Sequence, residues 1–224
     1  MTGRSILAAA LTTLASAAWA QPQVPPDMGL LQDVLVIGTP EGSAWTGTVD
    51  DGYYVLVNRS DPNAVHFAHA DGSALPDRLR VSVEVQVSAG DVTADDAPVA
   101  GAGLLYGFRT QPFSYHALLL SADGTVRLLQ HDEAGLRELA SIALEHFDSA
   151  APHQLRVVEY IGEITAVVDG RETIDLQIDA VGAGTVGIVA FGTGRFAFRD
   201  FSVTAVPGLY VSSQPIAHSR DGRK

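Results

Sequence analysis

Residues Gly103–Gln130 read GLLYGFRTQPFSYHALLLSADGTVRLLQ, three apolar runs separated by two turn sequences. The first break contains Thr110–Pro112 and the second contains Asp123-Gly124. An Asp-Gly pair between apolar runs is a strong hairpin signal, because glycine readily adopts the positive φ that tight hairpin turns need. The stretch therefore predicts three consecutive antiparallel strands joined by two turns.

The middle run, Phe113–Leu120, is apolar at almost every position. Successive side chains of a strand point to opposite faces, so each parity of this run lines a different face. One face holds Tyr115, Ala117 and Leu119, and the other holds His116, Leu118 and Leu120. We therefore expect a strand that is covered on both sides, in the middle of a layered β domain.

The run Leu79–Ser88 shows the clearest alternation in the chain. Leu79 and the valines at 81, 83, 85 and 87 alternate with Arg80, serines, Glu84 and Gln86. This period of two predicts a strand with one buried face and one face in water.

Other short apolar segments are separated by turns rich in glycine, aspartate and proline. We expect strands at Tyr53–Asn58, Ala64–His69, Leu136–Leu144, Gln154–Tyr160, Glu163–Val168, Glu172–Ile178, Gly184–Phe191 and Arg195–Ala205. The last of these changes parity between Phe198 and Phe201, which predicts a β-bulge near Arg199-Asp200. Without sustained helical periodicity outside the N-terminus, the pattern favours an all-β fold, a two-sheet antiparallel jelly-roll sandwich.

The N-terminal residues 1–20 have the pattern of a cleaved secretory signal. Arg4 precedes an apolar run, Ile6–Ala18, and Ala18-Trp19-Ala20 has the small-x-small form of a cleavage site. The run is shorter than the roughly 20 residues that span a bilayer. We therefore expect a bacterial protein that is periplasmic or secreted and has no membrane span.

The rest of the chain divides into three parts. Residues 21–40 are expected to form a proline-rich linker that ends in a first edge strand at Leu30–Ile37. Residues 41–206 form the β-sandwich, and residues 207–224 form a loose polar tail.

Composition excludes several classes of function. The chain has no cysteine, so disulfides and thiolate metal sites are ruled out. Its formal charge is −12 and becomes −13 when the signal is removed, since residues 1–20 contain one arginine and no acid. A chain this acidic is not expected to bind nucleic acid. We expect no cofactor, and the sequence does not specify an oligomeric state.

The order of four segments resembles a known family. They are GLLYGFR, SYHALLLSADGTVRLLQ, HQLRVVEYIGEITAVVDGRE and GTVGIVAFGTGRFAFRDFSV. In this order they resemble the concanavalin A-like lectin/glucanase domain, in particular its bacterial laminin-G-like branch and the related 3-keto-disaccharide hydrolase domain. The resemblance covers Trp45–Val206 and implies a concanavalin A-like sandwich that binds a glycan or a protein. The E-x-D-x-x-E strand of family 16 glucanases is missing.

Three local patterns suggest chemistry, but each has a simpler explanation. Residues 182–187 match G-x-G-x-x-G, yet strand-like sequence follows where a dinucleotide site needs a helix. Glu84 and Glu159 lie on expected strands, and solvent-facing alternation explains both without an acid/base pair. His131-Asp132-Glu133 lacks the H-x-x-x-H spacing of a metal site. We therefore assign no catalytic residue and no metal ligand.

Polar and aromatic residues within the central stretch are the candidate ligand-binding residues: Arg109, Tyr115, His116 and Arg127. If the sheet curves, one face would form a concave groove in which these side chains stack on sugar rings and donate hydrogen bonds. The alternative is that Tyr115 belongs to the core and both arginines lie at the rim.

Three functions remain open from the sequence. The first is an exported, non-catalytic module that binds a glycan, another extracellular polymer or a protein. The second is a carbohydrate-active enzyme of the 3-keto-disaccharide hydrolase kind, and the third is a structural envelope protein. Two carboxylates facing each other in a groove would favour the enzyme, whereas an aromatic and arginine platform would favour binding.

Overall fold

The computed structural model describes residues 26–70, 79–90, 100–160, 162–178 and 184–206. Within them, a 3-10 helix η1 (Pro26–Leu31) is followed by strands. The strands are β1 (Trp45–Asp50), β2 (Tyr53–Asn58), β3 (Val65–His69), β4 (Leu79–Ala89), β5 (Gly101–Thr110), β6 (Phe113–Ser121), β7 (Thr125–Asp132), β8 (Gly135–Ala143), β9 (His153–Tyr160), β10 (Glu163–Val168), β11 (Arg171–Gln177), β12 (Thr185–Phe191) and β13 (Gly194–Ala205).

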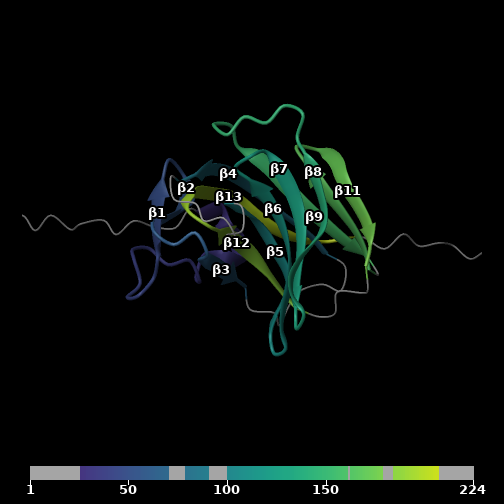
Figure 1. Cartoon of the computed structure of the whole chain (residues 1–224), viewed down its shortest axis with the longest axis horizontal. Helices are drawn as coiled ribbons and strands as arrows, with labels where there is room; N and C mark the ends of the chain where they lie inside the picture. Colours follow the sequence, from purple (N-terminus) through teal and green to yellow (C-terminus); the bar gives the residue numbers. More distant parts are fainter. Residues whose placement is uncertain (1–25, 71–78, 91–99, 161, 179–183, 207–224) are drawn as a thin grey trace, which may run out of the picture.

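The strands form two antiparallel sheets (Figure 1). The order is β1-β2-β13-β4-β9-β10-β11 in the seven-stranded sheet and β3-β12-β5-β6-β7-β8 in the six-stranded sheet. Strands β1 and β11, the edges of the larger sheet, lie at opposite sides of the molecule (Figure 1). The predicted all-β, two-sheet antiparallel sandwich is confirmed.

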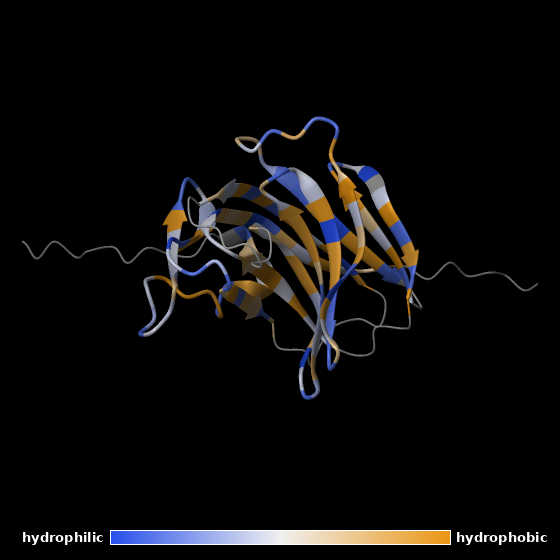
Figure 2. Ribbon diagram, in the orientation of Figure 1, coloured by the Kyte–Doolittle hydropathy of each residue, from blue (hydrophilic) through white to orange (hydrophobic). Residues whose placement is uncertain are grey.

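The main hydrophobic core lies between the two sheets. From the larger sheet, Val81, Val83, Val85 and Val87 of β4 are all 0–1% exposed. They belong to the same buried cluster as Leu118 of β6 in the smaller sheet. Figure 2 shows many apolar residues along the strands. Within β4, fully buried and less buried residues alternate, as its sequence predicts.

The central hairpins form as predicted. Strand β6 pairs with β5 and β7, and its residues from Tyr115 to Ser121 are buried. The turn between β6 and β7 contains Gly124, whose φ of 80° is the positive value that the Asp-Gly signal implies. The opposite turn, between β5 and β6, contains a cis peptide bond at Gln111-Pro112.

Two bulges change which face a side chain occupies. The predicted one in β13 is confirmed by a register shift between Arg199 and Ser202, where Asp200 has a φ of 54°. The other, which was not predicted, interrupts β5 between Tyr106 and Arg109. Because one residue is added there, Phe108 joins the cluster on the outer face of the sheet instead of the core.

The predicted first edge strand at Leu30–Ile37 is wrong. The segment begins in η1, which packs against β13, and Met28 and Leu31 are both 0% exposed. A kink at Gly29, with a φ of 51° and a ψ of −124°, lies between these two residues. Both side chains belong to the main core cluster, and their burial stabilises this conformation over an exposed edge strand.

Several sequence predictions lie outside the described residues: the signal at 1–20, the tail at 207–224, and the first two residues of the G-x-G-x-x-G match. The rest of that match leads into β12, which is the strand expected there. In the part of the chain that is described, no helix is long and apolar enough to cross a membrane.

Candidate ligand-binding face

The six-stranded sheet carries a second apolar cluster on the face turned away from the larger sheet. Its members are Leu105, Phe108, Tyr115, Ala117, Leu119, Leu129, Val189 and Phe191, with Val65 and Phe67 packed against them. Leu105 and Val189 are both 0% exposed even though this is the outer face of the sandwich. In a sheet with one face in water, the side chains on that face are mostly polar. The side chains on this outer face are apolar instead.

Aromatic rings gather at one end of this outer face. We call the following six side chains the aromatic face: Phe67 and His69 of β3, Phe108 of β5, Phe113 and Tyr115 of β6, and His131 of β7. Tyr115 stacks on His131 with centroids 5.1 Å apart and planes at 11°. His69 stacks on Phe108 at 4.5 Å. The rings therefore form one continuous surface across the sheet.

Phe113 is the most accessible ring of the aromatic face. It is 43% exposed and packs edge-on against Phe67, Phe108, Tyr115 and His131 at 5.1–6.2 Å. Exposure of a large apolar ring in the middle of an aromatic cluster is typical of a surface that meets a ligand.

Tyr115, one of the predicted ligand-binding residues, lies on the aromatic face because it is paired with His131 across β6 and β7. Burial raises the pKa of Tyr115 to about 12, so its phenol is neutral at physiological pH. The ring is 3% exposed, so Tyr115 packs against the neighbouring rings and offers little surface of its own to a ligand.

A pocket of about 470 Å³ adjoins the aromatic face at the end of the β5–β6 hairpin. It is lined by His69, Phe108, Arg109, Thr110, Gln111, Gly184 and Thr185. The predicted residue Arg109 is thus brought next to the rings. The Thr185 hydroxyl is buried and has no hydrogen-bond partner within the described structure, so the pocket contains a free polar group. Apolar walls with a few polar groups are typical of small-molecule sites.

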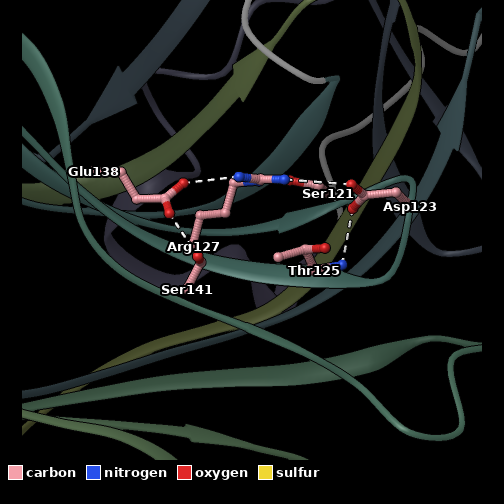
Figure 3. A network of polar contacts seen from close by, with 6 residues as sticks. All are labelled: Ser121, Asp123, Thr125, Arg127, Glu138 and Ser141. Atoms are coloured by element: carbon pink, nitrogen blue, oxygen red, sulfur yellow. Dashed lines mark hydrogen bonds and ion pairs between the residues drawn. The ribbon is translucent and has the colours of Figure 1, made fainter.

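Arg127 lies on the same outer face, but each nitrogen of its guanidinium contacts a neighbouring side chain (Figure 3). It pairs with Glu138 at 2.7 Å and Asp123 at 3.3 Å, and its Nε donates to the Ser121 hydroxyl at 3.2 Å. Arg127 is four residues from His131 on β7, about 13 Å along a strand. It therefore marks the far end of the face and not the aromatic site.

The two carboxylates around Arg127 are held ionised. Hydrogen bonds from Ser141 and Arg127 lower the pKa of Glu138. Burial alone would raise the pKa of Asp123, but bonds from Thr125 and Arg127 outweigh it and lower the value. A glycosidase needs one carboxyl group of raised pKa to protonate the leaving group. This pair does not provide one.

His116 does not lie on the outer face with Tyr115 and Arg127, so the prediction that one groove holds these side chains is wrong. The ring lies on the inner side of the sheet and stacks on Tyr106 at 5.3 Å, with 9% exposure. The reason is strand parity, since neighbouring residues 115 and 116 must point to opposite faces. Burial first, and then the positive charge of Arg137, lower the pKa of His116 to about 4.

The suspected acid pair is not assembled either. Glu159 lies opposite Leu79 in the β4–β9 register, whereas Glu84 lies opposite Gln154. The two acids are thus five residues apart along the strands, about 16 Å. Glu84 instead accepts a 2.7 Å hydrogen bond from the Tyr53 hydroxyl and pairs with Arg199 at 2.6 Å.

The first two residues of the His131-Asp132-Glu133 stretch have structural roles. His131 belongs to the aromatic face, and Asp132 accepts a 2.8 Å hydrogen bond from the backbone N–H of Ala134 in the β7–β8 turn. Within the described ranges, no three histidine or acidic side chains come together in a way that could hold a metal ion.

Sequence reasoning missed most of the aromatic face: Phe67, His69, Phe108, Phe113 and His131. Alternation within Val65–His69 does place Phe67 and His69 on one side of a strand. No sequence signal shows that β3 lies beside β12, with β12 and β5 between it and β6. The cluster depends on that sheet order.

No family model matches this chain, and no curated protein matches it. Solved structures do match by shape. The carbohydrate-binding module CBM66 from Bacillus subtilis aligns with a TM-score of 0.54 and 15% identity, over 73% of this chain and 96% of the module. The carbohydrate recognition domain of Emp46p, in a metal-free form, gives 0.55 and 15%, over 81% and 98%.

A third similar structure is the exoplasmic/lumenal domain of VIP36, solved with Ca²⁺ and Man3GlcNAc. It aligns with a TM-score of 0.55 and 10% identity, over 75% of this chain and 84% of the domain. At these identities the likeness establishes the fold alone. The chain has the concanavalin A-like, or galectin-like, β-sandwich fold.

Proposed function

We propose that this protein is a glycan-binding β-sandwich whose ligand lies across the aromatic face and the adjoining pocket. The observation that supports it best is the junction of an exposed ring, Phe113, with a pocket lined by Arg109, Thr110 and Gln111. Sugars present apolar C–H faces that pack on aromatic rings and hydroxyl groups that need hydrogen-bond partners. Both requirements are met within one short stretch of the β5–β6 hairpin.

The polar part of the proposed site is matched to hydroxyl groups. The Thr185 hydroxyl is buried and without a partner among the described residues, and Thr110 and Gln111 are exposed beside it. A buried polar group without a partner costs about 1–3 kcal/mol, so a ligand hydroxyl or a water that fills it is stabilising. Arg109 also lines this pocket, and its guanidinium carries several hydrogen-bond donors.

Structural similarity supports this proposal. Two of the similar structures are described as a carbohydrate-binding module and a carbohydrate recognition domain, and the VIP36 structure contains Man3GlcNAc. Those properties belong to these proteins, but they show that the fold is compatible with glycan recognition. The aromatic face provides a physical reason to extend that recognition to this chain.

We favour a non-catalytic role over the hydrolase alternative. The carboxylates on the outer face, Asp123 and Glu138, both have lowered pKa values and flank a guanidinium instead of a space for a sugar. Release of reducing sugar or of a keto-sugar from a panel of glycosides would support the hydrolase. Failure of the protein to bind any glycan would instead favour a structural envelope role.

The test is retention on a panel of insoluble neutral and acidic polysaccharides, measured by depletion from solution. The wild type is expected to be retained by at least one of them. The Phe113→Ala variant should lose at least about tenfold in affinity, because an exposed stacking ring is removed.

Ile142→Ala is the matched control, because Ile142 is 41% exposed on β8 and lies outside the aromatic face. It should bind like the wild type. Absence of binding to every polysaccharide, or equal loss in both variants, would overturn the proposal.

We also propose that the chain is exported to the periplasm or the medium of a bacterium, which would bring it into contact with extracellular glycans. The pattern of Arg4, the apolar run Ile6–Ala18 and the Ala18-Trp19-Ala20 site supports this. N-terminal sequencing of the mature protein from a bacterial expression host should give Gln21 as the first residue. A mature protein that keeps Met1 would contradict it.

A further inference from the structure

Four polar side chains lie in a row across the inner side of the six-stranded sheet, where the surrounding residues are apolar. The strand register pairs Tyr106 with His116, His116 with Gln130, and Gln130 with Arg137. The row therefore crosses β5, β6, β7 and β8 in order. It runs from the completely buried Tyr106 to the exposed Arg137.

This polar row borders a cleft of about 590 Å³ between the two sheets. The cleft is lined by His116, Gln130, Arg137, Leu139, Leu176, Gln177 and Ile178. The last three belong to the end of β11 and the residue that follows it, on the larger sheet. Its volume falls within the roughly 300–1,000 Å³ of typical small-molecule sites.

The inner end of the row has hydrogen-bonding groups that the described structure leaves unused. Both ring nitrogens of His116 and the hydroxyl of Tyr106 are buried and have no partner there. Leaving such buried groups without a partner destabilises the folded state. Because the pKa of His116 is lowered to about 4, its neutral ring offers one donor and one acceptor at pH 7. The cleft is thus suited to a ligand that carries a hydroxyl group.

The outer end of the row is positively charged. Arg137 donates a 2.6 Å hydrogen bond to the amide oxygen of Gln130, which is a neutral partner, and no salt bridge to Arg137 is found in the described part of the chain. Gln130 in turn donates to Asp132 at 3.0 Å and fixes the amide orientation. Among the described residues, none that lines the cleft is acidic. Such a mouth attracts a carboxylate.

We propose that this inter-sheet cleft is a second binding site, separate from the aromatic face, that takes a small aliphatic hydroxy acid. The carboxylate pairs with Arg137 at the mouth. The aliphatic body packs on Leu139, Leu176 and Ile178, and the hydroxyl exchanges hydrogen bonds with the ring of His116. Aliphatic walls favour an alkyl chain over a sugar ring, which prefers aromatic surfaces.

The experiment is isothermal titration of the full chain with 3-hydroxyhexanoate, hexanoate, hexan-1-ol and glucuronate. We expect 3-hydroxyhexanoate to bind most tightly, hexanoate more weakly because it lacks the hydroxyl, and hexan-1-ol not measurably. Glucuronate keeps the carboxylate and hydroxyls but has no alkyl body, so it should bind more weakly than hexanoate.

Two variants locate the site. Arg137→Gln should weaken 3-hydroxyhexanoate at least about tenfold, since a charge-assisted hydrogen bond is lost. His116→Phe keeps a ring against Tyr106 and should remove the advantage of 3-hydroxyhexanoate over hexanoate. Arg80→Gln, which removes the same charge from an exposed position on β4, is the control and should change nothing.

Three results would overturn the proposal. They are no binding of 3-hydroxyhexanoate at millimolar concentration, equal binding by wild type and Arg137→Gln, or tighter binding of glucuronate than of hexanoate. None of these results bears on the aromatic face, because its test uses polysaccharides and the Phe113 variant. A cleft filled by water alone would give the first result.

Discussion

The ring of His116 is kept neutral by its surroundings. It is 9% exposed between the sheets, and burial is the largest cause of the low pKa of about 4, followed by Arg137. Asp132 acts in the opposite direction and Arg109 adds a smaller lowering effect. A histidine with an ordinary pKa of 6.5 in the unfolded chain therefore takes up a proton on unfolding at mildly acidic pH.

The sign of this effect predicts a pH dependence of stability. Between pH 6.5 and about 4 the unfolded state binds the proton and the folded state does not, so the free energy of unfolding falls as pH falls. His116→Phe should lose about 2–3 kcal/mol less than the wild type between pH 7 and pH 4.5, measured by urea unfolding. His146→Gln, at an exposed histidine, should keep the wild-type slope. Identical slopes in wild type and His116→Phe would mean that His116 titrates normally in the folded protein.

At the scale of the strand, the β6–β7 hairpin depends on its turn glycine. Gly124 has a φ of 80°, and a Cβ added there would lie 2.7 Å from the side chain of Phe147. Gly124→Ala therefore combines backbone strain with crowding and should cost about 2 kcal/mol or more.

Gly170 provides a matched control for this change. It also follows an aspartate in a tight turn, its φ is 79°, and an added Cβ would meet nothing within 4 Å. Gly170→Ala should cost about 1 kcal/mol from strain alone. Chemical denaturation of the two variants measures the difference, and equal losses would show that Phe147 does not pack on the turn as described.

Elements of this protein could be predicted from sequence where the signal is local. The Asp123-Gly124 turn, the alternation of β4 and the bulge at Arg199-Asp200 depend on neighbours along the chain, and all three are confirmed. The bulge between Tyr106 and Arg109 could not be predicted, because its effect on Phe108 depends on pairing with β12 as well as β6.

The candidate site was only partly predictable for the same reason. Parity alone separates Tyr115 from His116, so the two could not share one groove. The position of Arg109 beside Phe108 follows from the hairpin. The ion pair of Arg127 with Glu138 depends on the β7–β8 register. A shift of one residue in that register would give Arg127 a different partner.

For the whole molecule, stability rests on the core between the sheets. Val83 of β4 is 0% exposed in that core, whereas Ser88 of the same strand is exposed on the other face beside Arg195. Val83→Asp would bury an unpaired charge and should cost several kcal/mol. Ser88→Asp introduces the same side chain into water and should change stability by less than about 0.5 kcal/mol. Similar melting temperatures for both variants would contradict the assignment of faces.

The polar face of β4 is less exposed to solvent than its sequence alternation suggests. Glu84 is joined to Tyr53 and Arg199, and the Arg199 guanidinium lies 4.4 Å from the Tyr53 ring centroid. Together these contacts bind β2, β4 and β13 across the outer face of the larger sheet. The outer face of the larger sheet is thus covered here by an ion pair, a hydrogen bond and a cation–π contact, whereas the smaller sheet carries the aromatic face with the exposed Phe113. This asymmetry is why we place the glycan on the six-stranded sheet.

The central claim is tested most directly by mapping a bound glycan onto the protein by NMR. A soluble oligosaccharide from the polysaccharide that retains the protein is titrated into isotope-labelled protein, and amide and aromatic shifts are followed. We predict that the largest shifts fall on Phe67, Arg109, Phe113 and Thr185. Largest shifts around Tyr53 and Glu84 on the seven-stranded sheet, with none at Phe113, would contradict the account.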